Sequence, residues 1–400
     1  MAKTFKFGEN GKWATKTGSS MAYNDQNGNF KPIPFSVTRD SIATRVNKQG
    51  LIEVVGKDKL RIDYKDSSNG VALLEPARTN LLTYSEDLSV SYWTKSNVTT
   101  TANAAISPDG TQNASEIVGT TSSNFTRAIN VAVGNGDTTM SCYVKSNDGV
   151  ERDFVFGAGS LGASNNGTFT ATSEWQRIEF TINTTAQSTD FGFFNSNGNQ
   201  LNMYVWGVQL EAGSYATSYI PTSGSTVQRA ADVANGAGNA QVFNDSEGVL
   251  FANMFIEDNI EDNVNISVSG GVHENDTFKF IYLPSTNELR AELNISPTVN
   301  TRITYDNLSL GQYNKIAASF NASTLKLYVN GFETNSISTN GLPSGLNQMN
   351  FDRADGVAPF YGKTKEIGVY DAVLTDAELE ALTSYTSFTN MANELNLTIK

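Results

Sequence analysis

Carboxylates between residues 255 and 267 are the first side chains in this sequence that could carry out catalysis. The stretch reads FIEDNIEDNVNIS and contains Glu257, Asp258, Glu261 and Asp262. A glycosidase needs two carboxyl groups about 5–10 Å apart on a rigid surface. Here the carboxylates are adjacent in pairs, and successive side chains of a strand point to opposite faces. The pattern therefore favours a solvated loop over a catalytic pair, and we expect the protein not to be an enzyme.

The same stretch offers oxygen ligands that suit calcium, because Ca²⁺ binds carboxylate and amide oxygens. Asp258 and Asp262 are the ligands expected there, next to asparagines. A second calcium candidate is FDRADGVAP at residues 351–359, with Asp352 and Asp355. An acidic turn that binds no ion is the alternative at both places. The sequence indicates no other cofactor.

Aromatic residues near turns suggest a different chemistry, the stacking of flat rings on sugars. The candidates for glycan binding are Trp93, Trp175, Tyr215 and Tyr219. Aromatic side chains also dominate the cores of β-sandwiches, so each of them could instead be a core anchor. Both interpretations remain open at this point.

Other reaction types lack the residues that they need. Cys142 is the only cysteine and His273 the only histidine, so no disulfide can form within the chain and a Ser-His-Asp triad would depend on one histidine in a polar loop. We expect Cys142 to be a small buried apolar residue. The glycine-rich stretch GAGSLGASNNG is not followed by Lys-Ser or Lys-Thr, which excludes a phosphate-binding loop.

Charge and hydropathy exclude two classes of partner. The net charge is −13 and the pI about 4.6, without a lysine or arginine cluster, which argues against nucleic acid. The first residues, MAKTFKFGENGKW, lack the apolar stretch of roughly 7–15 residues found in a signal peptide. No apolar run approaches the length of a membrane span. We expect the protein to be made in a cytosol, not to be exported by this route and not to insert into a membrane.

The elements that must position these residues are short strands. At 400 residues, two or three domains are expected. Residues 1–32 have weak periodicity and are predicted to be an extended arm whose removal leaves a folded protein. A hairpin turn is predicted at 47–50. After it, Leu60, Ile62 and Tyr64 alternate with polar residues, which predicts a half-buried strand with Arg61 on the solvent-exposed face.

Residues 72–232 show repeated strand patterns between Gly, Asn and Ser clusters, which is typical of a sandwich or jelly roll. The last strand is apolar on both faces, so it should be central. Alternation predicts that Tyr204, Trp206, Val208 and Leu210 share one face of it. Residues 233–246 are predicted to be a linker, rich in small residues.

A second sandwich is predicted for residues 247–383, followed by a tail at 384–400 that forms a last strand or a partner-binding peptide. Asn330 and Gly331 predict a two-residue hairpin turn. One short helix should begin after Thr375, which forms a capping box with Glu378. The predicted fold class is all-β: an N-terminal arm with hairpins at 1–71, then two antiparallel β-sandwiches and one C-terminal helix.

The ends of the middle segment carry a family resemblance. LLEPARTNLLTYSEDLSVSYWTKSNVT at 73–99 and VWGVQLEAGSYATSYIPTSGSTVQRAAD at 205–232 resemble the two ends of a carbohydrate-binding-module-like jelly roll in bacteriophage structural proteins. The likeness covers about residues 33–232. LKLYVNGFE and KEIGVYDAVLTDAELEAL, from within 247–383, are similar to laminin-G/concanavalin-A-like domains.

The resemblance implies a structural role for charged residues at both ends of the jelly roll. In such proteins the closing stretch is a strand that returns beside the first one. Arg78 and Arg229, with Glu75, Glu211 and Asp232 as partners, would then fasten the chain ends together.

The resemblance also implies a function: a virion structural protein, such as a head fibre, tail fibre or capsid decoration. Its sandwiches would display weak glycan sites in many copies on the virion surface, so that avidity compensates for low single-site affinity. Other virion proteins would bind its N-terminal region, and a homo-oligomer is expected, a trimer by analogy with fibres. The alternatives are a glycan-degrading enzyme of the tailspike type and a purely structural virion component.

Overall fold

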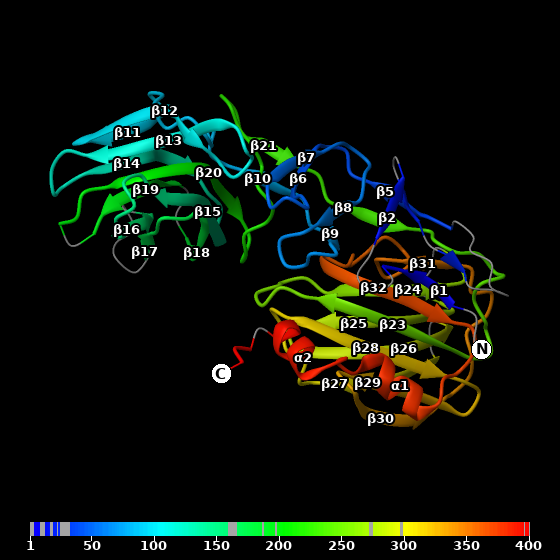
Figure 1. The fold of residues 1–400 in the computed structure, drawn as a ribbon. Coiled ribbons are helices and arrows are strands. Elements are labelled where there is room, and N and C mark those ends of the chain that lie inside the picture. Colours follow the sequence, from blue (N-terminus) through cyan, green and yellow to red (C-terminus); the bar gives the residue numbers. More distant parts are fainter. Residues whose placement is uncertain are drawn as a thin grey trace. The chain divides into compact units, whose positions relative to one another are not determined.

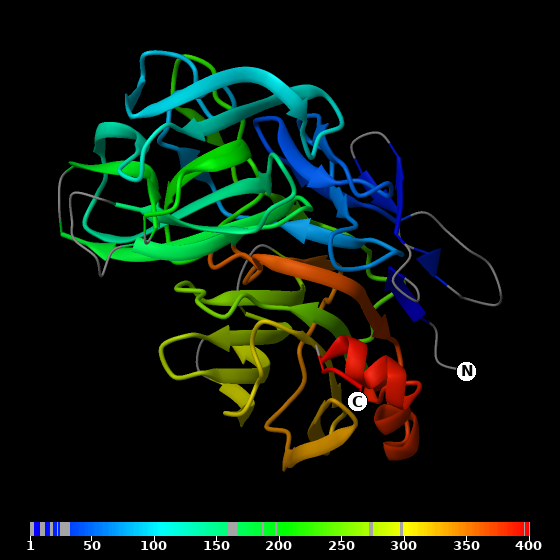
Figure 2. The ribbon, with the colours of Figure 1, turned by 60° about the vertical axis from the view of Figure 1, so that its left-hand side comes forward.

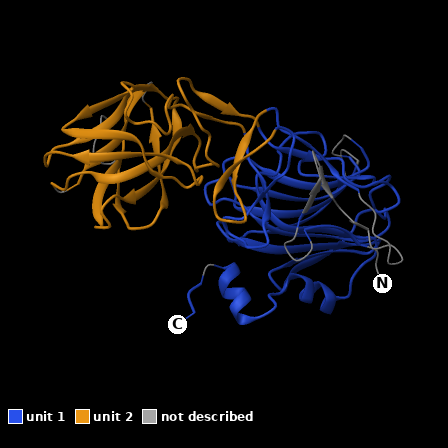
Figure 3. Cartoon of the chain, turned by 45° about the horizontal axis from the view of Figure 1, so that its top comes forward, with its two compact units in different colours: residues 1–40, 57–76, 231–400 blue, residues 41–56, 77–230 orange. Residues whose placement is uncertain are grey.

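A computed structural model describes residues 4–8, 13–16, 19–21, 23–24, 33–158, 166–185, 188–196, 198–271, 275–296, 299–395 and 397–399. The chain forms two compact units, coloured separately in Figure 3. Unit 1 contains residues 1–40, 57–76 and 231–400, and unit 2 contains residues 41–56 and 77–230. The chain therefore passes from one unit to the other four times. All the paired strands of the described residues are antiparallel, which confirms the all-β prediction.

Unit 1 is a sandwich whose larger sheet has nine strands (Figure 1). Its main path follows the order β30 (Phe332–Ser338), β29 (Thr324–Val329), β28 (Tyr313–Phe320), β23 (Gly248–Phe255), β32 (Gly362–Tyr370), β1 (Thr4–Phe7) and β4 (Tyr23–Asn24). Two further strands continue from β32, namely β9 (Val71–Leu74) and β8 (Arg61–Asp63).

The second large sheet of unit 1 has the order β27 (Val299–Tyr305), β26 (Glu288–Ser296), β25 (Thr277–Leu283), β24 (Val264–Ser269) and β31 (Gln348–Asn350). The main apolar core contains side chains from both sheets. A smaller sheet has the order β2 (Ala14–Lys16), β3 (Ser19–Met21), β5 (Phe35–Thr38) and β22 (Val233–Asn235).

Two helices follow the last strand of unit 1, α1 (Asp376–Thr383) and α2 (Phe388–Glu394). The predicted capping box of α1 is confirmed, because Thr375 and Glu378 cap each other's backbone. The sequence predicted one helix, and α2 lies in the segment expected to be a tail or a last strand. No helix among the described residues is long and apolar enough to cross a membrane.

The N-terminal residues do not form a separate arm, contrary to the prediction. β1 pairs with β32, from Thr4 opposite Tyr370 to Phe7 opposite Ile367. Phe5 and Phe7 are buried in the core of unit 1. A strand of four residues is too short to produce a convincing periodicity in the sequence, although TFKF does alternate.

The stretch at 233–246 is likewise not a linker, because it belongs to unit 1. β22 pairs with β5, and Val242 and Phe243 are buried. The predicted boundaries at 71 and 232 lie close to two of the points where the chain passes between the units, but the segments outside them belong to one unit and not to separate domains. Strands from before residue 75 form sheets with strands from after residue 232, which a segment-by-segment interpretation of the sequence cannot detect.

Unit 2 is a sandwich of two five-stranded sheets. One has the order β11 (Trp93–Ser96), β14 (Phe125–Ala132), β19 (Ser188–Asn195), β16 (Arg152–Gly157) and β17 (Asn166–Ala171). The other has the order β12 (Val98–Ile106), β13 (Gln112–Gly119), β20 (Asn202–Ala212), β15 (Gly136–Ser146) and β18 (Gln176–Thr184). Cys142 of β15 is buried in the core, as predicted.

Two small two-stranded sheets complete unit 2. The first pairs β6 (Ala43–Val46) with β7 (Ile52–Val55), around the turn predicted at 47–50. The second pairs β10 (Arg78–Asn80) with β21 (Val227–Arg229), so the strands that open and close the segment 77–230 lie side by side.

β20 is the central strand of its sheet, as predicted, but its side chains do not alternate throughout. Gly207 and Val208 lie opposite the single residue Cys142, and Gly207 has a φ of +64°. A bulge of this kind reverses the alternation. Val208 and Leu210 consequently face the core, and the prediction that they share a face with Trp206 is wrong.

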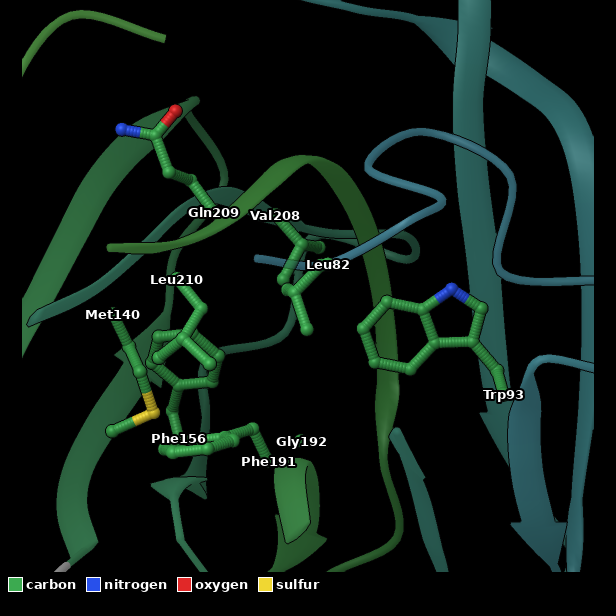
Figure 4. A pocket seen from close by; sticks show the side chains of 9 residues that line it. All are labelled: Leu82, Trp93, Met140, Phe156, Phe191, Gly192, Val208, Gln209 and Leu210. Carbon is green, nitrogen blue, oxygen red and sulfur yellow. The ribbon is translucent and has the colours of Figure 1, made fainter. Parts of the chain in front are cut away.

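Figure 4 shows the core side of this bulge. Leu210 lies against apolar side chains, whereas the amide of Gln209 points away from them. The gap between these side chains is too narrow for a water molecule. It is lined by Leu82, Trp93, Met140, Phe156, Phe191, Gly192, Val208, Gln209 and Leu210. We therefore treat this gap as part of the packed core and not as a binding site.

Candidate functional site

The four aromatic residues predicted to bind glycans lie in different surroundings within unit 2. Trp93 is 2% exposed, and its indole N–H donates to the Tyr84 carbonyl at 3.2 Å. Tyr219 is 4% exposed, and its hydroxyl lies 2.7 Å from Ser85 Oγ and donates to Glu86 at 2.8 Å. Both residues are core anchors, because a ring enclosed by protein cannot stack on a sugar.

Trp175 and Tyr215 are half-buried, so a face or edge of each ring reaches solvent. The Trp175 indole donates to the Ile106 carbonyl at 3.0 Å. The Tyr215 ring lies below the Arg78 guanidinium, 5.6 Å from its carbon. Stacking on a sugar stays a prediction for these two residues.

The acidic residues predicted to bind calcium are not gathered into a site. Asp258 and Asp262 are exposed. Asp352 is buried and accepts hydrogen bonds from the Ala354 backbone at 2.6 Å and from Asn235 at 2.5 Å. Burial raises the pKa of Asp352.

Asp355 forms an ion pair of 2.7 Å with Arg353, and this hydrogen-bonded arginine lowers the pKa of Asp355. Within the described ranges, no group of three or more acidic, histidine or cysteine side chains is arranged to hold a metal ion. His273 lies outside the described residues. Calcium binding remains an untested prediction for these aspartates.

The charged residues predicted to fasten the chain ends fall into two groups, one in each unit. In unit 1, Asp232 accepts a hydrogen bond of 2.7 Å from Arg39 and pairs with Arg61 through its other oxygen. Arg61 also contacts Glu75 at 2.6 Å. The Glu75 backbone N–H donates to Asp232 at 2.9 Å, which closes the group.

Arg39 and Arg61 were missed by the sequence analysis. Arg61 was predicted to face solvent because it alternates with Leu60 and Ile62, yet its side chain is fully buried. Alternation identifies the two faces of a strand, but it cannot show that the second face is also covered.

In unit 2, Glu211 is buried and accepts hydrogen bonds from Thr217 at 2.9 and 2.6 Å and from Gln209 at 2.7 Å. Arg229 donates to the Thr217 hydroxyl at 3.1 Å. Burial raises the pKa of Glu211, while the Thr217 bonds and Arg229 oppose that shift. Arg78 and Arg229 lie opposite each other on β10 and β21.

A further group of polar residues lies on the outward face of the nine-stranded sheet of unit 1. In β23, Leu250, Ala252 and Met254 face the core, so Asn253 between them faces outward. In β28, Ile316 and Ala318 face the core.

Tyr313 and Lys315 of β28 consequently point to the same outer side as Asn253. Lys365 comes from a bulge in β32, between the residues that pair with Asn253 and Met254. We call Asn253, Tyr313, Lys315, Lys365 and the nearby Tyr385 the sheet-face cluster.

Cations and rings alternate within the sheet-face cluster. The Lys365 ammonium lies 3.8 Å from the centre of the Tyr313 ring. The Lys315 ammonium lies 5.6 Å from the centre of the Tyr385 ring and donates to the Ser384 carbonyl at 2.8 Å. Lys365 also forms an ion pair with Glu394 of α2.

Three polar atoms of the sheet-face cluster are buried without a hydrogen-bond partner among the described residues. They are the side-chain oxygens Asn253 Oδ1, Tyr313 Oη and Tyr385 Oη. Burial and nearby carboxylates raise the pKa of Tyr313, and burial with Glu394 raises that of Tyr385 to about 12. Burial lowers the pKa of Lys315.

This arrangement can bind a polar molecule that also has an apolar face. It combines two ammonium donors, an amide oxygen and two tyrosines, each of which supplies a hydroxyl group and an aromatic ring. Nothing in the sequence analysis pointed to it, because each residue is ordinary by itself. The signal available was an asparagine within the apolar run LFANMF, and a Tyr-x-Lys pair on the outward face of another core strand.

Comparison with solved structures gives distant likenesses at 13–18% identity. A carbohydrate-binding module of a Ruminococcus gnavus sialidase, bound to α2,3-sialyllactose, is 17% identical, with 38% of this chain and 93% of that chain covered and a TM-score of 0.32. Domain 4 of a Geobacillus stearothermophilus arabinanase, in complex with arabinotriose, is 15% identical, with 43% and 84% covered and a TM-score of 0.32. A tandem carbohydrate-binding module from Paenibacillus barcinonensis is 13% identical, with 75% and 100% covered and a TM-score of 0.29.

None of the curated proteins matches the chain. Residues 257–380 match the model of one protein family, described as the concanavalin A-like lectin/glucanases superfamily. The matched segment begins just after β23 and ends within α1, so it lies entirely in unit 1. Unit 1 thus contains a segment with the sequence features of concanavalin A-like lectins and glucanases.

Proposed function

We propose that the protein binds glycans without cleaving them, and that the sheet-face cluster of unit 1 contacts the sugar. The observation that carries this proposal is a group of three buried polar oxygens, beside two lysines and two aromatic rings, that have no hydrogen-bond partner within the part of the chain that the structure describes. The family match supports it, because it covers β28 and β32, which supply Tyr313, Lys315 and Lys365.

The energetic argument concerns the unpartnered atoms. Leaving a buried donor or acceptor without a hydrogen bond costs about 1–3 kcal/mol. A ligand that supplies the missing bonds would recover part of this free energy. Sugar hydroxyls are suitable, since one hydroxyl can donate to Asn253 Oδ1 while another accepts from Tyr313 Oη. The apolar C–H face of a sugar ring can lie on an aromatic side chain.

A pair of tyrosine substitutions separates binding from folding. Tyr313→Phe removes an unpartnered hydroxyl, so stability should stay the same or rise while glycan affinity falls about threefold to tenfold, the equivalent of one hydrogen bond. Tyr282→Phe is the matched control, because the Tyr282 hydroxyl is bonded to Asn287 at 2.9 Å within unit 1. It should lower stability and leave glycan affinity unchanged.

The measurement is a glycan array probed with the multivalent full-length protein, followed by titration calorimetry and thermal melting of both variants. Absence of binding to every glycan by the wild-type protein would contradict the proposal. Equal affinity of Tyr313→Phe and the wild type would show that the sugar binds elsewhere, with Trp175 and Tyr215 as the next residues to substitute.

The setting that we propose is the surface of a bacteriophage virion, as a fibre or decoration protein assembled in the host cytoplasm with other virion proteins. Its support is the resemblance of residues 33–232 to phage structural proteins, described above. Several copies in a homo-oligomer would combine weak glycan sites into useful avidity. Immunogold labelling of purified virions tests the setting: gold on capsid or tail supports it, and unlabelled particles contradict it.

A further inference from the structure

We infer that α2 is a displaceable cover of the sheet-face cluster, and that the ligand that takes its place carries a carboxylate. This inference rests on the proposed function, because it concerns access to the same site and the class of glycan bound there. It goes further in assigning a role to the C-terminal segment.

α2 is attached mainly by polar contacts. Among its residues only Ala392 is buried, and Phe388 at its start is 67% exposed. By contrast, Leu379 of α1 is fully buried in an apolar cluster with Val249, Phe251, Ala317 and Tyr328 on the same outward face of the sheet. Figures 1 and 2 show both helices outside the strands of the sandwich.

A helix of seven residues has little stability of its own, since isolated helices shorter than about 12 residues are marginal in water. With so little apolar burial, α2 can be displaced at a small free-energy cost. Displacing α1 would expose its apolar cluster and is therefore unfavourable. The two helices follow each other in the chain, but α1 is held by buried apolar contacts and α2 is not.

The contacts of the C-terminal segment with the cluster imitate those of an acidic ligand. Glu394 places a carboxylate on Lys365, and the Ser384 carbonyl accepts from Lys315. When α2 leaves, Lys365 loses its acidic partner and the two ammonium groups remain beside each other. Repulsion from Lys365 contributes to the lowered pKa of Lys315, after burial. An incoming anion would relieve this repulsion.

Other carboxylates close to the cluster include Asp66, which forms an ion pair with Lys363, and Glu366. Glu366 forms an ion pair of 2.6 Å with Lys6 on the neighbouring strand β1. The group that leaves is therefore the Glu394 carboxylate, and the group that replaces it should have the same charge. The unpartnered oxygens of Tyr313, Tyr385 and Asn253 require hydroxyl groups as well, so the ligand is an acidic sugar, such as a hexuronate or a sialate.

The test uses the full-length protein on an array of carboxylated glycans, hexuronates and sialates, together with their methyl esters and with sulfated glycans. We expect at least one carboxylated glycan to bind, and its methyl ester to bind at least tenfold more weakly. Equal binding of the acid and the ester, or a preference for sulfated glycans, would overturn the assignment of a carboxylate.

The substitution Glu394→Gln tests whether α2 competes with the ligand for the sheet-face cluster. It should bind the same acidic glycan several-fold more tightly than the wild type, because the competing carboxylate is gone. Glu380→Gln is the matched control, since Glu380 is an exposed residue of α1, and it should bind like the wild type. Deletion of residues 387–400 is a second variant, and it should match or exceed the gain of Glu394→Gln.

Unchanged affinity in both Glu394→Gln and the deletion would overturn the role of α2 as a cover. If Tyr313→Phe still weakens binding in that case, the proposed glycan site stands and only the cover is wrong. If neither the wild type nor the deletion variant binds any glycan, the proposed function itself fails. The two failures are therefore distinguishable.

Discussion

Asp232 is the residue on which the ion-pair group of unit 1 depends. Its two carboxylate oxygens are shared between Arg39 and Arg61, and all three side chains are fully buried. Each member lies within five residues of a point where the chain passes between the units, namely residues 40, 56, 76 and 230. We propose that this group, which includes Glu75, fastens together the three segments of unit 1 close to the points where they lead to unit 2.

Replacing Asp232 with Ala should destabilise unit 1 by about 3–5 kcal/mol, because the buried Arg39 guanidinium loses this acidic partner and the buried Arg61 guanidinium keeps only Glu75. Urea unfolding at neutral pH measures the effect. Asp40→Asn is the control, since Asp40 pairs with Lys57 on the surface, and such pairs contribute little. Equal effects of the two substitutions would show that the buried group is not a stabilising element.

Glu211 of unit 2 gives a pH-dependent prediction. Burial raises its pKa above the ordinary value of 4.5, so the folded state holds the proton more tightly than the unfolded state. Stability should therefore fall as pH rises from about 4.5 through the raised pKa, and level off above it. Glu211→Gln should remove this component of the pH profile of unit 2.

The measurement is thermal melting of both proteins from pH 4 to pH 9, with the difference between them plotted against pH. The wild type should lose stability relative to Glu211→Gln as pH rises. A difference that stays constant or changes in the opposite direction would show that the Thr217 bonds and Arg229 outweigh burial in setting the pKa of Glu211.

At the scale of elements, the β20 bulge shows what alternation in a sequence can and cannot predict. The central position of β20 was predictable, because both faces carry apolar residues. The reversal at Gly207 was not, since a bulge depends on how many residues of the partner strand lie opposite. A glycine in an otherwise bulky strand is a signal for a bulge, and it was present in YVWGVQL.

Gly207→Ala should destabilise unit 2 by roughly 1–2 kcal/mol, because φ is +64° there and the left-handed region disfavours a side chain. The new methyl group would also lie 3.3 Å from the Tyr219 ring. Gly134→Ala is the control, since no atom lies within 4 Å of its added methyl group. Urea unfolding should show that Gly134→Ala is nearly neutral, and a similar loss in both variants would contradict the account of the bulge.

β1 is the element on which sequence and structure differ most. Residues 1–32 were predicted to be dispensable for folding, yet Phe7 is fully buried, with its ring centre 4.2 Å from that of Phe35. The prediction failed because the partner of β1 is β32, which lies more than 350 residues away in the chain. Composition near the N-terminus contains no information about that pairing.

Phe7→Ala should therefore destabilise unit 1 by about 3–5 kcal/mol, as expected for removing a large aromatic side chain from a core. Phe332→Ala is the matched control, because Phe332 is 76% exposed on β30, and its loss should change stability by less than about 0.5 kcal/mol. Thermal melting of both variants compares their losses of stability. A neutral Phe7→Ala would restore the interpretation of this segment as an arm.

At the scale of the whole molecule, the fold class was predictable, whereas the combination of distant segments into one unit was not. Short strand patterns, turn residues such as Asn330-Gly331 and the Thr375 cap were identified correctly, because they depend on neighbours in the sequence. Unit 1 is built from three separate segments of the chain, and this depends on long-range pairing. The sheet-face cluster has the same origin, since its residues come from three strands and the C-terminal segment.

The central claim is that the sheet-face cluster of unit 1 is a glycan site under a displaceable cover. The most direct measurement is a crystal structure of the full-length protein with a carboxylated glycan that the array identifies. We predict sugar density within hydrogen-bond distance of Tyr313 Oη and Asn253 Oδ1, a carboxylate on Lys365, and α2 displaced. A sugar bound elsewhere, with Glu394 still on Lys365, would contradict the account.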